Sequence, residues 1–398
     1  MRPGGIRRRA APEARAMKTS PSMTYARARL WTGMAGVGSA VLLAAALLVL
    51  QVPERVLGGR GGALPGDAAL LLAVLAAGAL VTLPFDLLGG LVLPRRFGRP
   101  APGAVGFAGA WLRGVTIILL LSTASGVLLL AAGRAGGRPA AVGAFLVAAA
   151  ALVLLQEPIA RLVGGLRRSR ELGAAGAGPG AGRVRFLEGR DPGFSGGFSG
   201  PAGTLVLPAR WARCLTPEAL AVLIDRRLGI LRSGAWWRTL VLAALWNALG
   251  FLLASLLPGA GVQTVAELVT TALGFTLWTF AGLLVLPTPS RRATVAADAR
   301  AAGDGEARRH LIEAIARIDR LQDDEPERSP GLELVFHPVP SVARRERALA
   351  GPPPPGPGAW HLARTALYLA HAGLSLLPRL VHCNAGRPEL WVYLPADG

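Results

Sequence analysis

The chain has 398 residues, of which 52% are hydrophobic and only 17% are charged, and its mean hydropathy is +0.43. This balance argues against a soluble globular domain and favours an integral membrane protein. The net charge of +19 would suit a nucleic-acid-binding protein, but the arginines cluster beside apolar runs, where membrane topology explains them, so we expect no nucleic acid as a partner.

The first predicted element follows a basic N-terminal stretch, residues 1–29, which we expect on the cytoplasmic side. The apolar run at about 30–51 is too long for the core of a signal peptide, and we interpret it as a transmembrane helix. Further runs long enough to cross about 30 Å of hydrocarbon follow at about 67–88, 110–132, 139–160, 239–257 and 266–287. The sequence therefore predicts an α-helical polytopic membrane protein with about six transmembrane helices, arranged as a four-helix region at 30–160 and a later hairpin at 239–287.

Arginines are concentrated in alternate loops between these runs. The loop at 94–109 and the stretch after residue 160 are rich in arginine, whereas the loop at 258–265 has no basic residue. By the positive-inside rule, this places both termini and the segment 161–238 in the cytoplasm. We expect a multi-pass protein of the bacterial inner (cytoplasmic) membrane, with the lipid bilayer as a partner.

A split cytoplasmic module is expected on either side of the hairpin, at 161–238 and 288–350. Its first half contains a glycine-rich linker at 173–182, short strands such as "GTLVLPARW" and one longer helix. Its second half has apolar residues at helical spacing in "EARRHLIEAIARIDRL". The pattern predicts a mainly helical α+β module.

The C-terminal part begins with a proline-rich linker at 351–358, which we interpret as a stiff, polyproline-type spacer. Residues 359–398 then contain an apolar stretch that His361, Arg364 and Arg379 interrupt. These interruptions argue against a seventh span, and we expect an amphipathic tail that lies on the cytoplasmic leaflet.

The longer helix of the module, "LTPEALAVLIDRRLGILRSG", opens with Thr216 as N-cap and Pro217 in the first turn. With the strand before it, this segment resembles the HtpX-like and CAAX-prenyl-protease-like membrane zinc metallopeptidases, in which a similar stretch ends in H-E-x-x-H. The resemblance puts Asp225 at the first histidine, Arg226 at the catalytic glutamate and Gly229 at the second histidine.

Two later segments continue the resemblance beyond the hairpin. In "SRRATVAADARA", Ala297 and Asp298 match the A-D pair of the family's E-x-x-A-D motif, and Thr294 falls at its glutamate ligand. In "FHPVPSVARRERAL", His337 and Pro338 match a downstream H-P pair, and either Arg344 or Arg345 matches the arginine that follows it. The resemblance covers roughly residues 183–350 and implies a split metallopeptidase-like module.

The residues that the resemblance places at these positions cannot form a catalytic zinc site. A catalytic zinc of this type needs two neutral imidazoles one helical turn apart and a carboxylate. Gly229 has no side chain, Thr294 offers only a hydroxyl, and Arg226 is cationic at any relevant pH and cannot act as a base. The sequence therefore predicts vestigial positions at Asp225, Arg226, Gly229 and Thr294, with no metal and no cofactor.

The predicted function is that of a catalytically inactive metallopeptidase-like protein that binds or scaffolds a membrane client. Arg226 and Arg227 would favour an acidic peptide or a carboxylate as the partner. One alternative is an active membrane metalloendopeptidase with unconventional ligands, which would contain zinc. Another is a small-solute transporter or channel, which requires polar residues such as Asn247 within the helix bundle.

Overall fold

The computed structural model describes residues 23–60, 62–169, 184–303, 305–352 and 358–393. Most of the basic N-terminus, the glycine-rich linker and most of the proline-rich linker lie outside the described residues. The helices of the membrane part are α1 (Tyr25–Val49), α2 (Val52–Leu57), α3 (Leu64–Leu87), α4 (Leu93–Arg96), α5 (Ala104–Leu154), α9 (Ala235–Ala254) and α10 (Val265–Val285). The remaining helices are α6 (Gln156–Gly164), α7 (Ala209–Cys214), α8 (Pro217–Arg232), α11 (Pro287–Ala301), α12 (Gly305–Gln322), α13 (Pro330–Phe336), α14 (Val342–Leu349) and α15 (Leu362–Leu369).

Five helices in the described part of the chain are long and apolar enough to cross a membrane. They are Tyr25–Val49, Leu64–Arg96, Ala104–Leu154, Ala235–Ala254 and Val265–Ala301. The prediction of a polytopic helical membrane protein with a small additional sheet is confirmed. The count differs from the predicted six because α5 contains two of the predicted runs.

The two runs within α5 meet at a break in the helix. Gly136 and Gly137 have non-helical backbone angles, and Gly137 has a φ of +66°, which glycine tolerates because it has no Cβ. Arg113, in the first run, donates a hydrogen bond to the carbonyl of Val163, which lies beyond the second run. A straight helix would separate residues 50 positions apart by about 75 Å. The chain therefore reverses at the glycine pair, and α5 forms a hairpin.

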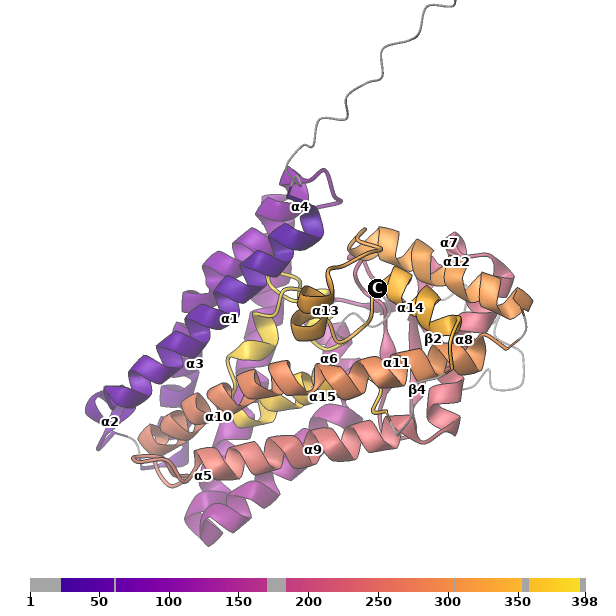
Figure 1. Ribbon diagram of the computed structural model, residues 1–398. Coiled ribbons are helices and arrows are strands. Elements are labelled where there is room, and N and C mark those ends of the chain that lie inside the picture. The colour runs from indigo at the N-terminus through magenta and orange to yellow at the C-terminus, as the bar shows by residue number, and fades with distance from the viewer. Residues whose placement is uncertain (1–22, 61, 170–183, 304, 353–357, 394–398) are drawn as a thin grey trace, which may run out of the picture.

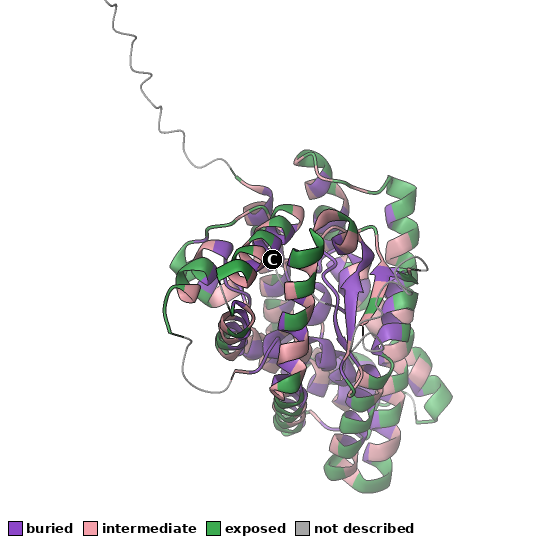
Figure 2. Cartoon of the chain, turned by 90° about the vertical axis from the view of Figure 1, so that its right-hand side faces the viewer, coloured by how far each residue is buried: buried purple, intermediate pink, exposed green. Residues whose placement is uncertain are grey.

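Large apolar side chains are exposed along the outer faces of these helices. Examples are Leu80 at 64%, Leu112 at 61% and Leu245 at 61% exposure. Figure 2 shows the same division, with exposed residues on the outer helix faces and buried residues in the interior. An apolar surface of this extent requires a covering phase, and a bilayer supplies it without further protein.

The module between the membrane helices is built around a four-stranded sheet. The strands are β1 (Arg167–Arg168), β2 (Val184–Glu188), β3 (Gly197–Ser199) and β4 (Thr204–Pro208), in the order β1-β2-β4-β3. β2 and β4 are parallel, and the outer strands pair antiparallel to them. Behind the sheet, the fully buried Trp211 and Leu223 join strand residues in one apolar core, which positions α8.

Helices α10 and α11 connect the two parts of the molecule. They follow one another along nearly one line and carry the chain from the membrane helices into the module (Figure 1). α8 packs against α11 and α12, so the segment that resembles a zinc helix lies beside the segment that resembles the second motif.

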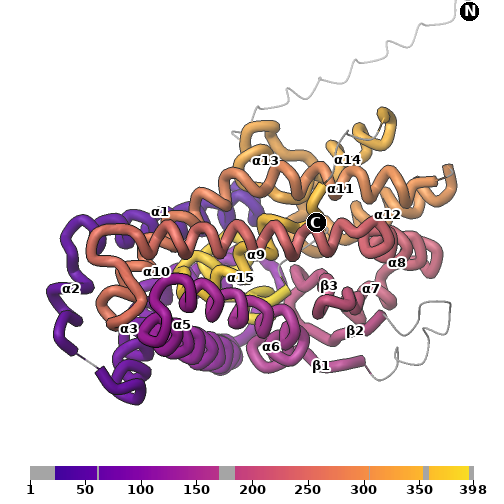
Figure 3. The backbone as a smooth tube through the Cα atoms, turned by 90° about the horizontal axis from the view of Figure 1, so that it is seen from below, coloured from indigo at the N-terminus to yellow at the C-terminus, as the bar shows by residue number. Residues whose placement is uncertain are grey.

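The tail is the main departure from the sequence prediction. We expected residues 359–398 on the membrane surface, but the described residues 358–393 are largely buried within the molecule. α15 contacts α5, α9, α10 and α11, and in Figure 3 the tail lies among α1, α5, α9 and α10. The prediction was wrong because each polar interruption was treated as a group that needs water.

A buried carboxylate on α3 binds two polar groups of the tail. Asp86 on α3 is fully buried and forms an ion pair with Arg379, with a distance of 2.5 Å between Oδ2 and Nη2. Its other oxygen accepts a hydrogen bond of 2.7 Å from the backbone nitrogen of Gly386, and the indole of Trp111 donates to Oδ2 at 2.8 Å. Asp86 therefore anchors the tail to the membrane helices.

Candidate functional site

The helix α8 begins and ends with ordinary local signals. The hydroxyl of Thr216 accepts a hydrogen bond of 3.2 Å from the backbone nitrogen of Ala219, Pro217 occupies the first turn, and Gly234 beyond the end has a φ of +67°. The buried residues are Ala219, Leu223, Arg226, Arg227 and Ile230. This inward face, which includes two arginines, determines what the site can do.

The structure separates the predicted vestigial positions onto different faces of α8. Asp225 points outward, with a side chain that is 63% exposed and pairs with Arg232. A Cβ added at Gly229 would meet nothing within 4 Å. Two zinc ligands of an H-E-x-x-H helix must lie four residues apart on one face. Three buried pairs have that spacing: Ala219 and Leu223, Leu223 and Arg227, and Arg226 and Ile230. The last pair lies one residue after the predicted register, and its Arg226 reaches α11.

Arg226 forms a buried ion cluster with two residues from other helices. Its Nε lies 2.5 Å from Oδ1 of Asp298 on α11. Arg345 on α14 binds the same carboxylate through two hydrogen bonds, Nε to Oδ2 at 2.7 Å and Nη2 to Oδ1 at 2.9 Å. None of the three residues is more than 1% exposed. The cluster links α8, α11 and α14 and carries a net charge of +1.

Thr294 and Ala297 line the α11 side of this cluster. Thr294 is fully buried one turn before Asp298, and its hydroxyl donates to the carbonyl of Ser290 at 3.1 Å. Ala297 is 2% exposed. The structure therefore brings three of the resemblance-derived positions, Arg226, Thr294 and Asp298, to one buried place.

Arg227 serves a different internal contact. Its Nη2 donates to the carbonyl of Ser195 at 2.9 Å, and its guanidinium lies 4.9 Å from the ring centroid of Trp211. Arg226 and Arg227 are 1% and 0% exposed. We expected both arginines to face an acidic partner, and the structure corrects this: both belong to the packing of the module.

The donor set around the cluster does not fit a zinc ion. The inward positions of α8 offer two guanidiniums and otherwise only aliphatic side chains, and Thr294 offers a hydroxyl that already has a backbone partner. Asp298 is the one carboxylate of the cluster, and two arginines bind both of its oxygens. Among the described residues, no three histidine, cysteine, aspartate or glutamate side chains converge in a way that could bind a metal.

The residues of the downstream motif, an H-P pair and a later arginine, lie in two separate parts of the structure. Arg345, rather than Arg344, reaches Asp298, whereas Arg344 pairs with Glu333 at 3.1 Å. His337 is buried elsewhere, with its ring 5.2 Å from the ring of His382, and Pro338 lines a cavity between α1 and α10. Burial lowers the pKa of His337, and the nearby Arg328 and His382 add to this effect, so its imidazole is neutral at pH 7.

One signal in the sequence indicates the correct face of α8. Ala219, Leu223 and Ile230 repeat at spacings of four and seven, and Arg226 falls on the same stripe. A register taken from this stripe would select Arg226 and Ile230. The bridging role of Arg345 has no comparable signal, because it depends on how α14 packs against α11.

The described geometry combines a membrane helix bundle, a small sheet, and α8 packed against α11 on either side of the hairpin of α9 and α10. Comparison with solved structures agrees, since the chain is similar to the crystal structure of Ste24p from S. mikatae with a TM-score of 0.64. The sequence identity is 15%, and the match covers 82% of this chain and 86% of that chain. Neither a protein-family model nor a curated protein sequence matches. At this identity the likeness concerns the fold, which is that of a Ste24-type membrane metallopeptidase.

Proposed function

We propose that this protein is a non-catalytic member of the Ste24-type fold that acts in a bacterial inner membrane by binding a membrane partner. The observation that carries the proposal is the buried cluster of Arg226, Asp298 and Arg345, at the place where the ligands of a metallopeptidase would lie. The proposed absence of hydrolysis is argued from the charge and geometry of this cluster.

Electrostatics supports a vacant site. A guanidinium stays protonated at any relevant pH, so Arg226 cannot coordinate a cation and repels it over a short distance inside the protein. The carboxylate of Asp298 is already neutralised by two arginines. A divalent ion would have to displace at least one guanidinium and leave it buried without its partner, which costs several kcal/mol.

The covering of the sheet edge supports the same proposal. β3 is an outer strand, and an extended peptide typically adds to such an edge. Here the tail lies beside it: the ring of Trp360 is 5.0 Å from the ring of Phe198, and a Cβ added at Gly197 would lie 3.4 Å from the ring of Tyr393. All three residues of β3 are buried. A substrate peptide would need to displace part of this protein's own chain.

The test is the metal dependence of the purified full chain. We expect elemental analysis of protein prepared with added zinc to give less than about 0.1 zinc per chain. A chelator should leave the thermal unfolding temperature in detergent unchanged, because no structural metal is removed. One zinc per chain, together with a loss of stability on chelation, would favour the active metalloendopeptidase and refute the proposal.

A further inference from the structure

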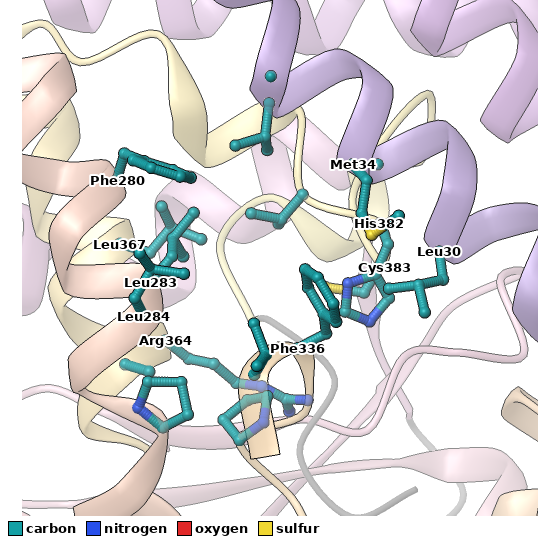
Figure 4. A pocket seen from close by; sticks show the side chains of 18 residues that line it. Leu30, Met34, Phe280, Leu283, Leu284, Phe336, Arg364, Leu367, His382 and Cys383 are labelled. Atoms are coloured by element: carbon teal, nitrogen blue, oxygen red, sulfur yellow. The ribbon is translucent and has the colours of Figure 1, made fainter. Parts of the chain in front are cut away.

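An elongated cavity of about 300 Å³ lies between α1 and α10, away from the Arg226–Asp298–Arg345 cluster. Its walls are almost entirely apolar, with Val37 of α1, Phe280 and Leu283 of α10, and Leu367 of α15 among them (Figure 4). This volume is at the lower end of those of small-molecule sites.

The polar groups of this cavity are gathered at one end. Arg364 of α15 extends across that end toward Phe336, and His382 and Cys383 lie nearby (Figure 4). Arg364 is the one formally charged residue among those that line the cavity. Burial, with a further contribution from Arg29, lowers the pKa of His382 to about 3, so its imidazole adds no charge at pH 7. The cavity therefore combines an apolar channel with a single positive end.

The open side of the cavity faces the surface that a bilayer would cover. Leu284 on its wall is 47% exposed, and it belongs to α10, one of the membrane-length helices. Beside it, α13 presents Leu332 and Leu334 outward at 38% and 54% exposure, although it follows a strongly charged helix. Outward leucines on a short helix of the module are typical of contact with the interfacial region.

The distribution of polar groups distinguishes a lipid from a peptide as the occupant. A peptide would place backbone N–H and C=O groups along the whole channel, and each would need a partner in an apolar wall. A hydrocarbon chain needs none. The single arginine at one end then matches one negative charge at the head of the chain.

We propose that this cavity binds one acyl chain of an anionic phospholipid from the cytoplasmic leaflet, with the lipid phosphate near Arg364. The chain enters between α1 and α10 and reaches Leu367 and Val381, which are 3% and 8% exposed and cannot touch bulk lipid otherwise. The site is independent of the proposed vacancy of the zinc-type helix.

The first test uses native mass spectrometry of the full chain. The protein is released from vesicles that contain equal amounts of phosphatidylglycerol and phosphatidylcholine with the same acyl chains. We expect one retained phosphatidylglycerol per chain, with at least a tenfold preference over phosphatidylcholine. Arg364→Gln should abolish the preference, and Arg364→Lys should keep it, because the charge remains.

A cavity-filling variant provides the matched comparison. A Cβ at Gly38 meets nothing within 4 Å, and Gly38 lines the cavity, so Gly38→Leu places a side chain in the channel. We expect lipid retention to fall at least tenfold. Gly143→Leu, on an exposed face of α5 with equal space, should retain lipid as the unaltered protein does.

The second test needs no variant. Phosphatidylglycerol with a photoactivatable group at the end of one chain should label the buried Leu367 or Val381. Labelling confined to exposed residues of α1 and α10 would overturn the proposal. So would retention without preference between the two lipids, a retained fatty acid in place of the phospholipid, or unchanged retention in a folded Gly38→Leu protein.

Discussion

Arg226, Asp298 and Arg345 form a buried group in which one carboxylate serves two guanidiniums. Burying such charges costs free energy, and the mutual attraction and the hydrogen bonds to Asp298 offset part of that cost. In a zinc enzyme, a cation would join the corresponding helices. Here the positive charge belongs to the side chain of Arg226 itself. Its ion pair with Asp298 joins α8 to α11 without a metal.

Removing one member of this group should destabilise the protein strongly. For Arg226→Met we expect a loss of about 3 kcal/mol, because Asp298 keeps Arg345 but loses one charged partner. The measurement is thermal unfolding in detergent. Asp225→Asn is the matched control on the same helix: its pair with Arg232 is exposed, and its loss should cost less than about 1 kcal/mol. Equal effects of the two changes would contradict the assignment of the inward face.

At the scale of elements, the tail is held by close approaches that only glycine permits. Leu88–Val92 form a π-helical turn, and within it a Cβ at Gly90 would lie 2.0 Å from the carbonyl oxygen of Gly386. Bundle residues also bind the tail: Asn247 donates to the carbonyl of Ala366 at 3.0 Å, and Thr239 donates to that of Trp360 at 2.7 Å. These two polar residues of the bundle thus have structural partners in the tail.

Gly90→Ala should therefore detach the end of the tail. The added methyl group clashes with backbone, which cannot move as a side chain can, so the contact between this π-helical turn and the tail should open. We expect trypsin to cut after Arg379 at least tenfold faster than in the unaltered protein. Gly109→Ala, where a Cβ meets nothing within 4 Å, is the control and should not change the rate. A resistant tail in Gly90→Ala would show that this contact is not what holds it.

The membrane helices and α8 could be predicted from the sequence because their signals are local: apolar runs, an N-cap, and a glycine pair between two runs. The place of the tail could not. Its main anchor joins Asp86 to Arg379, 293 residues apart, and no pattern near either residue indicates the other. The motif on α8 was aligned by its charged residues, whereas the apolar stripe indicates which face is buried, and Asp225 and Gly229 lie off that face.

At the scale of the whole molecule, the fold of a membrane metallopeptidase is present while the interior is filled by the chain itself. The tail occupies space between the membrane helices and the sheet, and the ion cluster occupies the zinc-type site. Under the proposal of a non-catalytic protein, both features act in the same direction: the tail lies beside the edge strand β3, and the ion cluster lies where a metal would be bound. On this account the fold is stable without a bound metal ion.

The most direct measurement is the zinc content of rebuilt sites. Arg226→His, Ile230→His and Thr294→Glu, combined in one protein, place two imidazoles and a carboxylate on the inward face, with Asp298 able to orient the first imidazole. Asp225→His, Gly229→His and Thr294→Glu, the control, place the imidazoles on the exposed face. Elemental analysis should give about one zinc per chain for the first protein and none for the control or the unaltered chain. Stoichiometric zinc in the control or in the unaltered chain would contradict the account.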